Sequence, residues 1–178
     1  MHGEVLIALL LAASVLRPGR VQRKPRPFAT VPQAAGNFTL NVTPAAISFN
    51  AVNPGTAPTV PGSTSARITW QVLSGGANWS LKVQAASPSF ANCPAIPISA
   101  VTVSCASASV SSTVGGSANC AASFPLSTAP VQVAGGSEGA ISFNYSVTVN
   151  FTLADSWKYA AATNPACSLS LTYTADVP

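Results

Sequence analysis

Residues 141–153 read Ile-Ser-Phe-Asn-Tyr-Ser-Val-Thr-Val-Asn-Phe-Thr-Leu, and they decide the fold. Every odd position from Ile141 to Leu153 is apolar, whereas every even position is serine, asparagine or threonine. A period of two places alternate side chains on opposite faces of a sheet, so the pattern predicts an antiparallel strand with one face on a core and the other in water. The strand would span roughly 43 Å, and this length predicts a bend or bulge along it.

Shorter alternating runs indicate further strands on either side of this stretch. Residues 68–72 and 79–85 flank a short Ser-Gly-Gly-Ala-Asn connection, which predicts a hairpin. Proline-rich residues 53–65 and glycine-rich residues 135–139 are predicted to be loops. The count of about eight or nine strands predicts an all-β fold, an antiparallel immunoglobulin-like β-sandwich, with a barrel as the alternative. The other candidate strands are residues 38–42, 47–52, 98–105, 121–126, 130–133 and 169–173.

Charged residues are scarce in the part of the chain that is expected to fold. Of the eight lysines and arginines, five lie before residue 28. From Phe28 onward three basic residues accompany three acidic ones, and three minus three leaves no net charge. A neutral domain without a basic patch argues against nucleic acid as a partner. The six charged residues are Arg67, Lys82, Lys158, Glu138, Asp155 and Asp176.

An apolar run lies near the amino terminus. Residues 5–16 carry no charge and are too few for a permanent membrane span, which is typical of a signal-peptide core. Basic residues follow this run instead of preceding it, which leaves an uncleaved anchor as an alternative. We expect a signal peptide or signal anchor over 1–16, a disordered basic Pro-rich linker over 17–35, and a single β-sandwich domain over 36–178. After cleavage no transmembrane span would remain, and the domain would be secreted, extracellular or at the cell surface.

The cysteines form an even set in a chain that is expected to be exported, so two disulfide bonds are expected. Four cysteines allow three pairings. If residues 98–105 form one extended strand, Cys105 lies about 23 Å along it, too far for five residues to bring Cys93 within bridging distance. The pairs Cys105 with Cys120 and Cys93 with Cys167 are therefore favoured, and the third pairing stays open. Zinc is disfavoured because no C-x-x-C motif is present, and we expect no metal.

Side chains suited to catalysis are few. The only histidine, His2, lies in the leader, which removes the Ser-His and Cys-His arrangements and the usual metal sites. Glu138 and Asp155 could form a carboxylate pair, but Glu138 is expected to be solvated in its turn and Asp155 to cap another. Two Ser-x-Lys sequences, at 80–82 and 156–158, occur in a chain that is rich in hydroxyl groups throughout. We expect no catalytic residue, no cofactor and no enzyme activity.

The aromatic residues suggest a binding site. Trp70 and Trp79 alternate with polar residues in predicted strands and are expected in the core. Trp157 and Tyr159 follow the long strand, and an exposed pair of this kind could stack on the apolar faces of sugar rings. The alternative is that Trp157 closes one end of the sandwich.

Two segments resemble the motifs of the WxL-type surface domains of bacteria. Residues 78–83, Asn-Trp-Ser-Leu-Lys-Val, are similar to the first motif, and residues 145–155 to the second, with Phe151 in place of its tryptophan. The cysteines of this chain are not part of the usual sequence pattern of WxL-type domains. The resemblance implies a secreted β-rich protein attached noncovalently to peptidoglycan or another cell-wall polymer.

The sequence therefore predicts a secreted, non-catalytic bacterial cell-surface protein with a structural or adhesive role, in contact with cell-wall polysaccharide or with like subunits. One alternative is a carbohydrate-binding module with a defined soluble glycan as its ligand. Another is a subunit of an extracellular fibre or pilus, because strand edges with few charges present little obstacle to edge-to-edge pairing.

Overall fold

The computed structural model describes residues 39–177, apart from 51, 73–76, 112–114, 140, 157–158 and 160–165. For residues 70–72 and 141–143 it describes the backbone only. The predicted leader and linker, and Trp157, lie outside the described residues. Residues Gly36–Pro178 form one compact unit.

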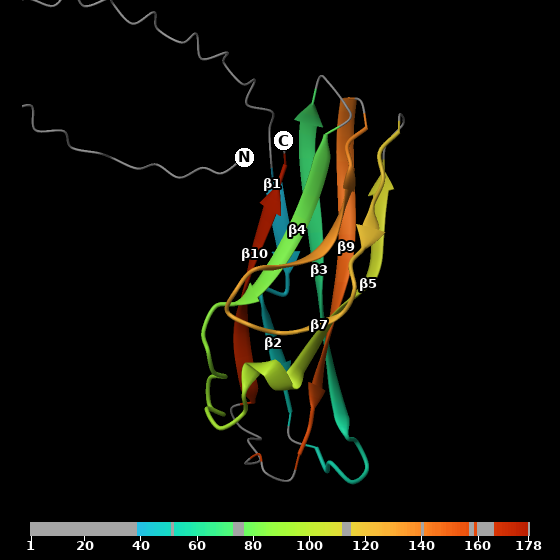
Figure 1. Cartoon of the computed structure of the whole chain (residues 1–178). Helices are drawn as coiled ribbons and strands as arrows, with labels where there is room; N and C mark the ends of the chain where they lie inside the picture. Colours follow the sequence, from blue (N-terminus) through green and yellow to red (C-terminus); the bar gives the residue numbers. More distant parts are fainter. Residues whose placement is uncertain are drawn as a thin grey trace, which may run out of the picture. The chain divides into compact units, whose positions relative to one another are not determined.

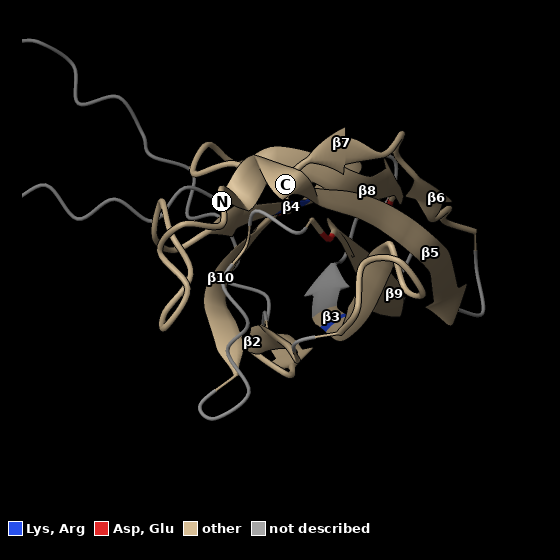
Figure 2. Cartoon of the chain, turned by 90° about the horizontal axis from the view of Figure 1, so that it is seen from below, with Lys and Arg blue, Asp and Glu red and all other residues tan. Residues whose placement is uncertain are grey.

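Ten strands form two antiparallel sheets of five strands each, arranged like a sandwich (Figure 1). Seen along the strands, the sheets curve around a common interior, with only small areas coloured for charged residues (Figure 2). Among the described residues, no helix is long and apolar enough to cross a membrane. One sheet has the order β1-β3-β9-β5-β7 and the other β2-β10-β4-β8-β6. The elements are β1 (Thr39–Thr43), β2 (Ala46–Phe49), β3 (Thr59–Val72), β4 (Asn78–Ala85), a 3-10 turn η1 (Ile98–Ala100), β5 (Val101–Ser111), β6 (Asn119–Cys120), β7 (Phe124–Pro125), β8 (Val131–Ser137), β9 (Ile141–Ala154) and β10 (Cys167–Asp176).

Strand β9 is the long strand that the alternating pattern predicts, and it lies at the centre of its sheet. It pairs with β3 over its full length without a shift in register. The bulge expected along residues 141–153 is instead found on the other neighbour of β9, strand β5, where the register shifts at Ala106 between Cys105 and Ser107. The inserted residue moves the inward side chains of β5 from odd to even positions, which explains the weak alternation of this segment.

The apolar side of β9 forms the centre of the hydrophobic core. Its described inward side chains, from Tyr145 to Leu153, are at most 3% exposed. They pack with Trp79, Leu81 and Val83 of β4 and with apolar residues of β10, as the sequence predicts. The side chain of Trp70 lies outside the described residues. The inward side chains of β9 are Tyr145, Val147, Val149, Phe151 and Leu153.

The predicted hairpin between residues 68–72 and 79–85 is wrong. Strands β3 and β4 lie in opposite sheets, so the chain crosses the sandwich between them. Strand β3 already has β1 on one side and β9 on the other, which leaves no edge for β4. A short glycine-containing connection is compatible with both a hairpin and a crossing between sheets, and the pairing of β3 decides between them.

The predicted loop over residues 53–65 is also too long, because β3 begins at Thr59. Strand β1 pairs only with Ser65–Thr69, so the first residues of β3 have a neighbour on one side alone. Pro61 can stand in such an edge segment because a missing N–H removes no ladder hydrogen bond there.

Two other segments differ from the sequence prediction. Gly135 and Gly136 belong to strand β8, not to a loop, because the backbones of Trp79 and Ser117 approach them closely. A Cβ on Gly136 would lie 2.0 Å from the Ser117 carbonyl oxygen, so the strand requires glycine here. The predicted strand at 121–126 is replaced by two-residue strands β6 and β7 in different sheets, which raises the strand number to ten.

Two disulfide bonds have the pairing that the sequence favours. Cys93 joins Cys167, and both are buried, so the irregular segment before η1 is fixed to the start of β10. Cys105 on β5 joins the exposed Cys120 on β6, so this bond links the two sheets. Two such bonds indicate folding in an oxidising environment.

A buried hydrogen bond also links the sheets. The Thr64 hydroxyl on β3 is hydrogen-bonded to the Tyr173 hydroxyl on β10. Thr64 is 2% exposed, so water cannot replace this partner. Burial raises the pKa of Tyr173 to about 12, and the hydrogen bond to Thr64 lowers it in part.

Replacing both members of a disulfide pair by alanine is expected to lower the free energy of unfolding according to the loop that the bond closes. The Cys93–Cys167 bond spans 74 residues and should contribute about 4 kcal/mol, whereas the Cys105–Cys120 bond spans 15 and should contribute about 3 kcal/mol. Guanidinium denaturation of the two double variants measures both values. A larger loss for the shorter loop would contradict this order.

Tyr173→Phe should cost about 1–2 kcal/mol at neutral pH, because it leaves the Thr64 hydroxyl buried without this partner. It should also alter the alkaline stability profile. The folded wild type keeps the Tyr173 proton up to about pH 12, whereas the unfolded chain loses it near pH 10, so the free energy of unfolding should fall by about 2 kcal/mol between these values. Denaturation curves from pH 8 to about pH 12 test this, and parallel profiles for wild type and variant would refute it.

Candidate functional site

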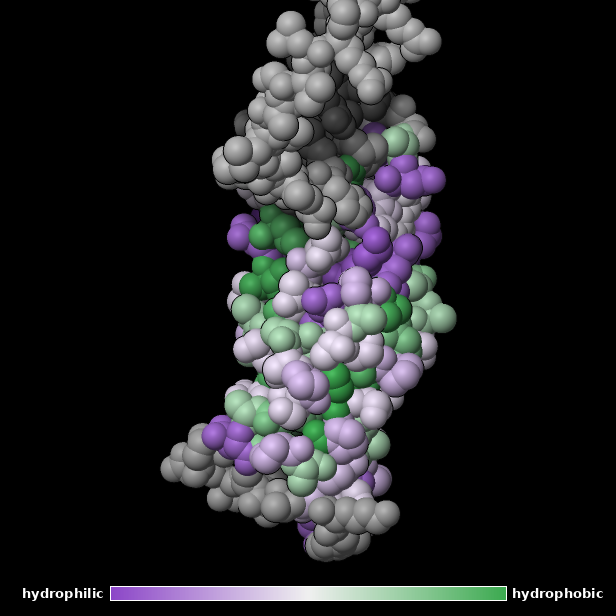
Figure 3. All heavy atoms as spheres, turned by 60° about the vertical axis from the view of Figure 1, so that its left-hand side comes forward, coloured by the Kyte–Doolittle hydropathy of each residue, from purple (hydrophilic) through white to green (hydrophobic). Residues whose placement is uncertain are grey.

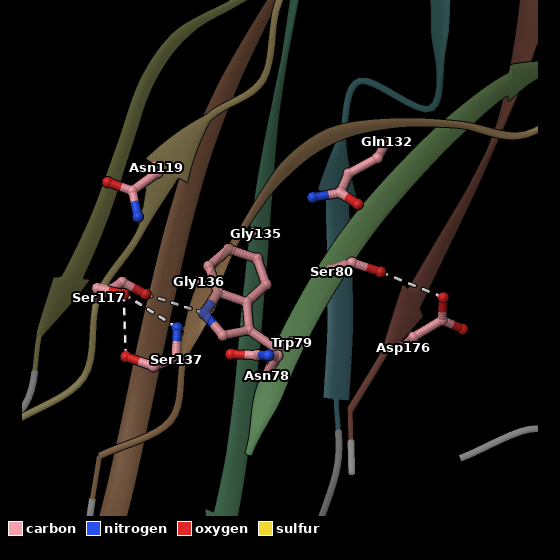
Figure 4. A pocket seen from close by; sticks show the side chains of 10 residues that line it. All are labelled: Asn78, Trp79, Ser80, Ser117, Asn119, Gln132, Gly135, Gly136, Ser137 and Asp176. Atoms are coloured by element: carbon pink, nitrogen blue, oxygen red, sulfur yellow. Dashed lines mark hydrogen bonds between the residues drawn. The ribbon is translucent and has the colours of Figure 1, made fainter. Parts of the chain in front are cut away.

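A polar groove lies on the outer side of the β2-β10-β4-β8-β6 sheet. It has a volume of about 590 Å³ and receives side chains from β4, β8, β10 and the β6 region (Figure 4). Amide and hydroxyl groups predominate, and Asp176 is the one charged lining residue. The lining residues are Asn78, Trp79, Ser80, Ser117, Asn119, Gln132, Gly135, Gly136, Ser137 and Asp176.

The strand register explains how this groove forms. Asp176 pairs with Ser80, Ser80 with Gly135, and Gly135 with Asn119, so one row crosses four strands. Strands lie about 4.8 Å apart, which makes the row about 14 Å long. Cross-strand neighbours share a face of the sheet, and Gly135 contributes no side chain in the middle of the row. Polar side chains therefore lie at both ends of the row, and the Gln132 side chain lies close to Gly135 in its middle.

Three amide side chains in the groove are available to a ligand. Asn78, Asn119 and Gln132 are exposed, and no other described residue hydrogen-bonds to their amide groups. Each amide offers two donor hydrogens and an acceptor oxygen. In Figure 4, Asn119 and Gln132 lie on either side of the Trp79 ring, with Asn78 below it.

An ion pair compensates the carboxylate at one end of the row. The Lys82 ammonium lies 2.5 Å from Asp176 Oδ2, and the Ser80 hydroxyl donates to the same oxygen at 3.2 Å. Both charged side chains are partly exposed, so the pair contributes at most about 1 kcal/mol to stability. Its main effect on the groove is to leave little net charge there.

The base of the groove is held by hydrogen bonds. Trp79 is 2% exposed and donates its indole N–H to the Ser117 carbonyl oxygen at 3.0 Å. Ser117 and Ser137 are joined through their hydroxyl groups, and each backbone N–H donates to the other residue. The Tyr145 ring lies 4.5 Å from that of Trp79, and its hydroxyl donates to the Ser137 carbonyl oxygen. The wall at Ser117 is therefore fixed to both sheets.

A carboxyl group lies buried next to this base. Glu138 is 4% exposed, contrary to the prediction of a solvated side chain in a turn. Its backbone N–H donates to the Ala77 carbonyl oxygen, which continues the pairing of β4 and β8 by one residue. Burial raises the pKa of Tyr145, the negative charge of Glu138 raises it further, and a hydrogen bond with the Gly139 backbone lowers it.

The carboxyl groups of Glu138 and Asp155 are not brought together as a pair, and Lys158 of the second Ser-x-Lys sequence lies outside the described residues. Strand β9 separates Glu138 from Asp155 by about 45 Å of extended chain. Asp155 Oδ1 accepts a hydrogen bond from the backbone N–H of the next residue, Ser156, at 2.8 Å. Ser80 and Lys82 both contact Asp176 Oδ2.

The predicted aromatic site at Trp157 and Tyr159 is described in part. Tyr159 is half-buried against the core, and Trp157 lies outside the described residues. Residues 119, 132 and 176 were not singled out by sequence reasoning. No local motif marks them, because they are adjacent only through the pairing of four strands.

A second surface covers the outer side of the β1-β3-β9-β5 sheet, and we call it the hydroxyl face. It extends over about 27 Å along β9 and about 14 Å across four strands. Arg67 is its one charged side chain among the described residues. The face consists of Thr39, Asn41 and Thr43 on β1, Ser63, Ser65, Arg67 and Thr69 on β3, Asn144, Ser146, Thr148, Asn150 and Thr152 on β9, and Thr102, Ser104, Ser107, Ser109 and Ser111 on β5.

No protein-family model matches this chain, and no curated protein or solved structure is significantly similar to it.

Proposed function

We propose that the protein is a secreted, non-catalytic adhesive module of the bacterial cell surface, and that its hydroxyl face lies against a neutral cell-wall polymer. The observation that carries this proposal is the composition of that face. Seventeen outward positions, in register over four strands, hold serine, threonine or asparagine with one arginine.

The register gives the hydroxyl face a regular spacing. Ser65, Thr148 and Ser107 form one row across three strands, and Ser63, Asn150 and Ser104 form the row beside it. Rows repeat about 6.6 Å apart along the strands and residues about 4.8 Å apart across them. A repeating polymer can therefore make the same hydrogen bonds at successive positions, which adds up many weak contacts.

The lack of charge indicates which partners the hydroxyl face suits. Anionic polymers would need a basic surface, and Arg67 is itself engaged, donating to the Asn144 amide oxygen at 3.1 Å. Apolar partners would need an apolar patch, yet Val52 is the one exposed large apolar side chain in the described part of the chain. On the side drawn in Figure 3, the surface is mostly of intermediate hydropathy. Neutral polyhydroxylated polymer is the remaining class with matching groups.

The resemblance to WxL-type surface domains supports the same cellular role. Its two segments meet in the core, where Trp79 of the first contacts Tyr145 of the second. Trp79, Leu81 and Phe151 are buried, so these motif residues support the fold and do not touch a polymer. Contact with the wall would be made by the outward-facing residues that alternate with these buried ones.

An immunoglobulin-like relationship forms part of this proposal. Consecutive strands β3 and β4 lie in opposite sheets, as do β8 and β9. Repeated crossing between two antiparallel sheets is a feature of Greek-key sandwiches, and this connectivity supports the relationship.

Sedimentation with insoluble bacterial cell wall and with insoluble neutral polysaccharide tests the proposed function. Wild type should sediment with at least one of them. Ser65→Glu with Ser107→Glu places two exposed charges on either side of Thr148 and should weaken binding at least about tenfold, because carboxylates would lose water without gaining a partner.

The matched control is Ser48→Glu with Ser170→Glu, which adds the same charge at exposed positions of β2 and β10 on the other sheet, outside the groove lining. It should bind as wild type does. Absence of wild-type sedimentation would refute the adhesive role, and equal losses in both variants would refute its assignment to the hydroxyl face.

A further inference from the structure

We propose that the groove of the β2-β10-β4-β8-β6 sheet is a separate binding site for a neutral oligosaccharide. It lies on the sheet opposite to the hydroxyl face and uses different residues, so each of the two proposals can be refuted without the other. The row Asp176–Ser80–Gly135–Asn119 forms its axis.

The dimensions of the groove suit a short oligosaccharide. Its volume of about 590 Å³ lies within the range of ligand sites, and the row of about 14 Å exceeds the size of one sugar ring. Gly135 allows the Gln132 side chain and the Trp79 backbone to approach closely. A Cβ at this position would lie 2.7 Å from the Gln132 amide nitrogen and 2.8 Å from the Trp79 carbonyl oxygen, so any side chain here would displace the groove wall.

The hydrogen-bonding groups match those of a polyol. Sugar hydroxyls both donate and accept, and the amides of Asn78, Asn119 and Gln132 do the same. These three amides come from three different strands or their ends and border one hollow. A ligand that spans the row can therefore contact several of them at once without disturbing hydrogen bonds among the described residues.

The charges of the groove favour a neutral ligand. No basic side chain lines the groove and Lys82 compensates the charge of Asp176, so uronic acids, phosphates and sulfates would find no cation to pair with. A cation would compete with Lys82, which already lies 2.5 Å from that carboxylate. The Asp176 oxygens can in addition accept hydrogen bonds from vicinal hydroxyl groups, which an uncharged sugar provides.

The groove is also rigid where a ligand would contact it. Trp79 supports the base from below, and its bond to Ser117 fixes the wall next to Asn119. The adjacent Cys120 is tied to β5 by a disulfide bond. Groups held in place before binding lose little conformational entropy on binding, which helps a site that depends on hydrogen bonds.

Titration of the intact, disulfide-bonded protein with soluble neutral oligosaccharides tests this site, with NMR detection of backbone and side-chain amides. The panel comprises hexasaccharides of cellulose, xylan, mannan, amylose and chitin, with hexagalacturonate as the acidic probe. At least one neutral member should cause saturable shifts in the side-chain signals of Asn119 and Gln132, and hexagalacturonate should cause none.

Asn119→Ala and Gln132→Ala should each weaken that binding about fivefold to tenfold. Asn50→Ala, at an exposed asparagine that belongs neither to the groove nor to the hydroxyl face, is the matched control and should leave the affinity unchanged. Failure of every neutral member to bind would overturn the proposal, as would shifts confined to another surface or undiminished affinity in both groove variants. Because the shifts are mapped on wild type, the result does not depend on the folding of a variant, and wall sedimentation by the hydroxyl face is read separately.

Discussion

Burial of one side of β9 is the constraint on which the rest of the structure depends. Its inward side chains from Tyr145 to Leu153 are nearly inaccessible, and they form one apolar cluster with residues of the other sheet. Each large side chain buried in this way contributes roughly 1.5–3 kcal/mol. Since β9 pairs on both sides, with β3 and β5, its register also fixes the outward positions of both neighbours. The polar residues that alternate with these apolar ones therefore form the hydroxyl face on the opposite side of the sheet.

The sequence pattern predicts the parts of the fold that depend on local alternation. Strand β9, the inward Trp79 and the favoured disulfide pairs follow from spacing along the chain, and the structure confirms them. The hairpin prediction fails because pairing partners are decided across the whole domain. Strand β3 finds both neighbours elsewhere, and no residue of the connection carries that information.

The predictions that rest on glycine and proline are wrong for a related reason. Gly135 and Gly136 read as a turn, but they lie in β8 because neighbouring backbone leaves no room for a Cβ. Pro61 reads as a loop residue, but it stands in the part of β3 that lacks a second neighbour. The groove cannot be predicted from the sequence for the same reason, since its row joins residues 80, 119, 135 and 176 through strand pairing alone.

The bond between Cys93 and Cys167 has a mechanical consequence for a protein exposed to flow or to pulling between surfaces. A tension applied along the chain passes directly through this covalent bond and bypasses the 74-residue span that it encloses. Strands β5, β8 and β9 lie within that span and cannot be drawn out, even if the strands outside it separate. The enclosed segment therefore adds no length under load, and the protein can lengthen only by its outer segments.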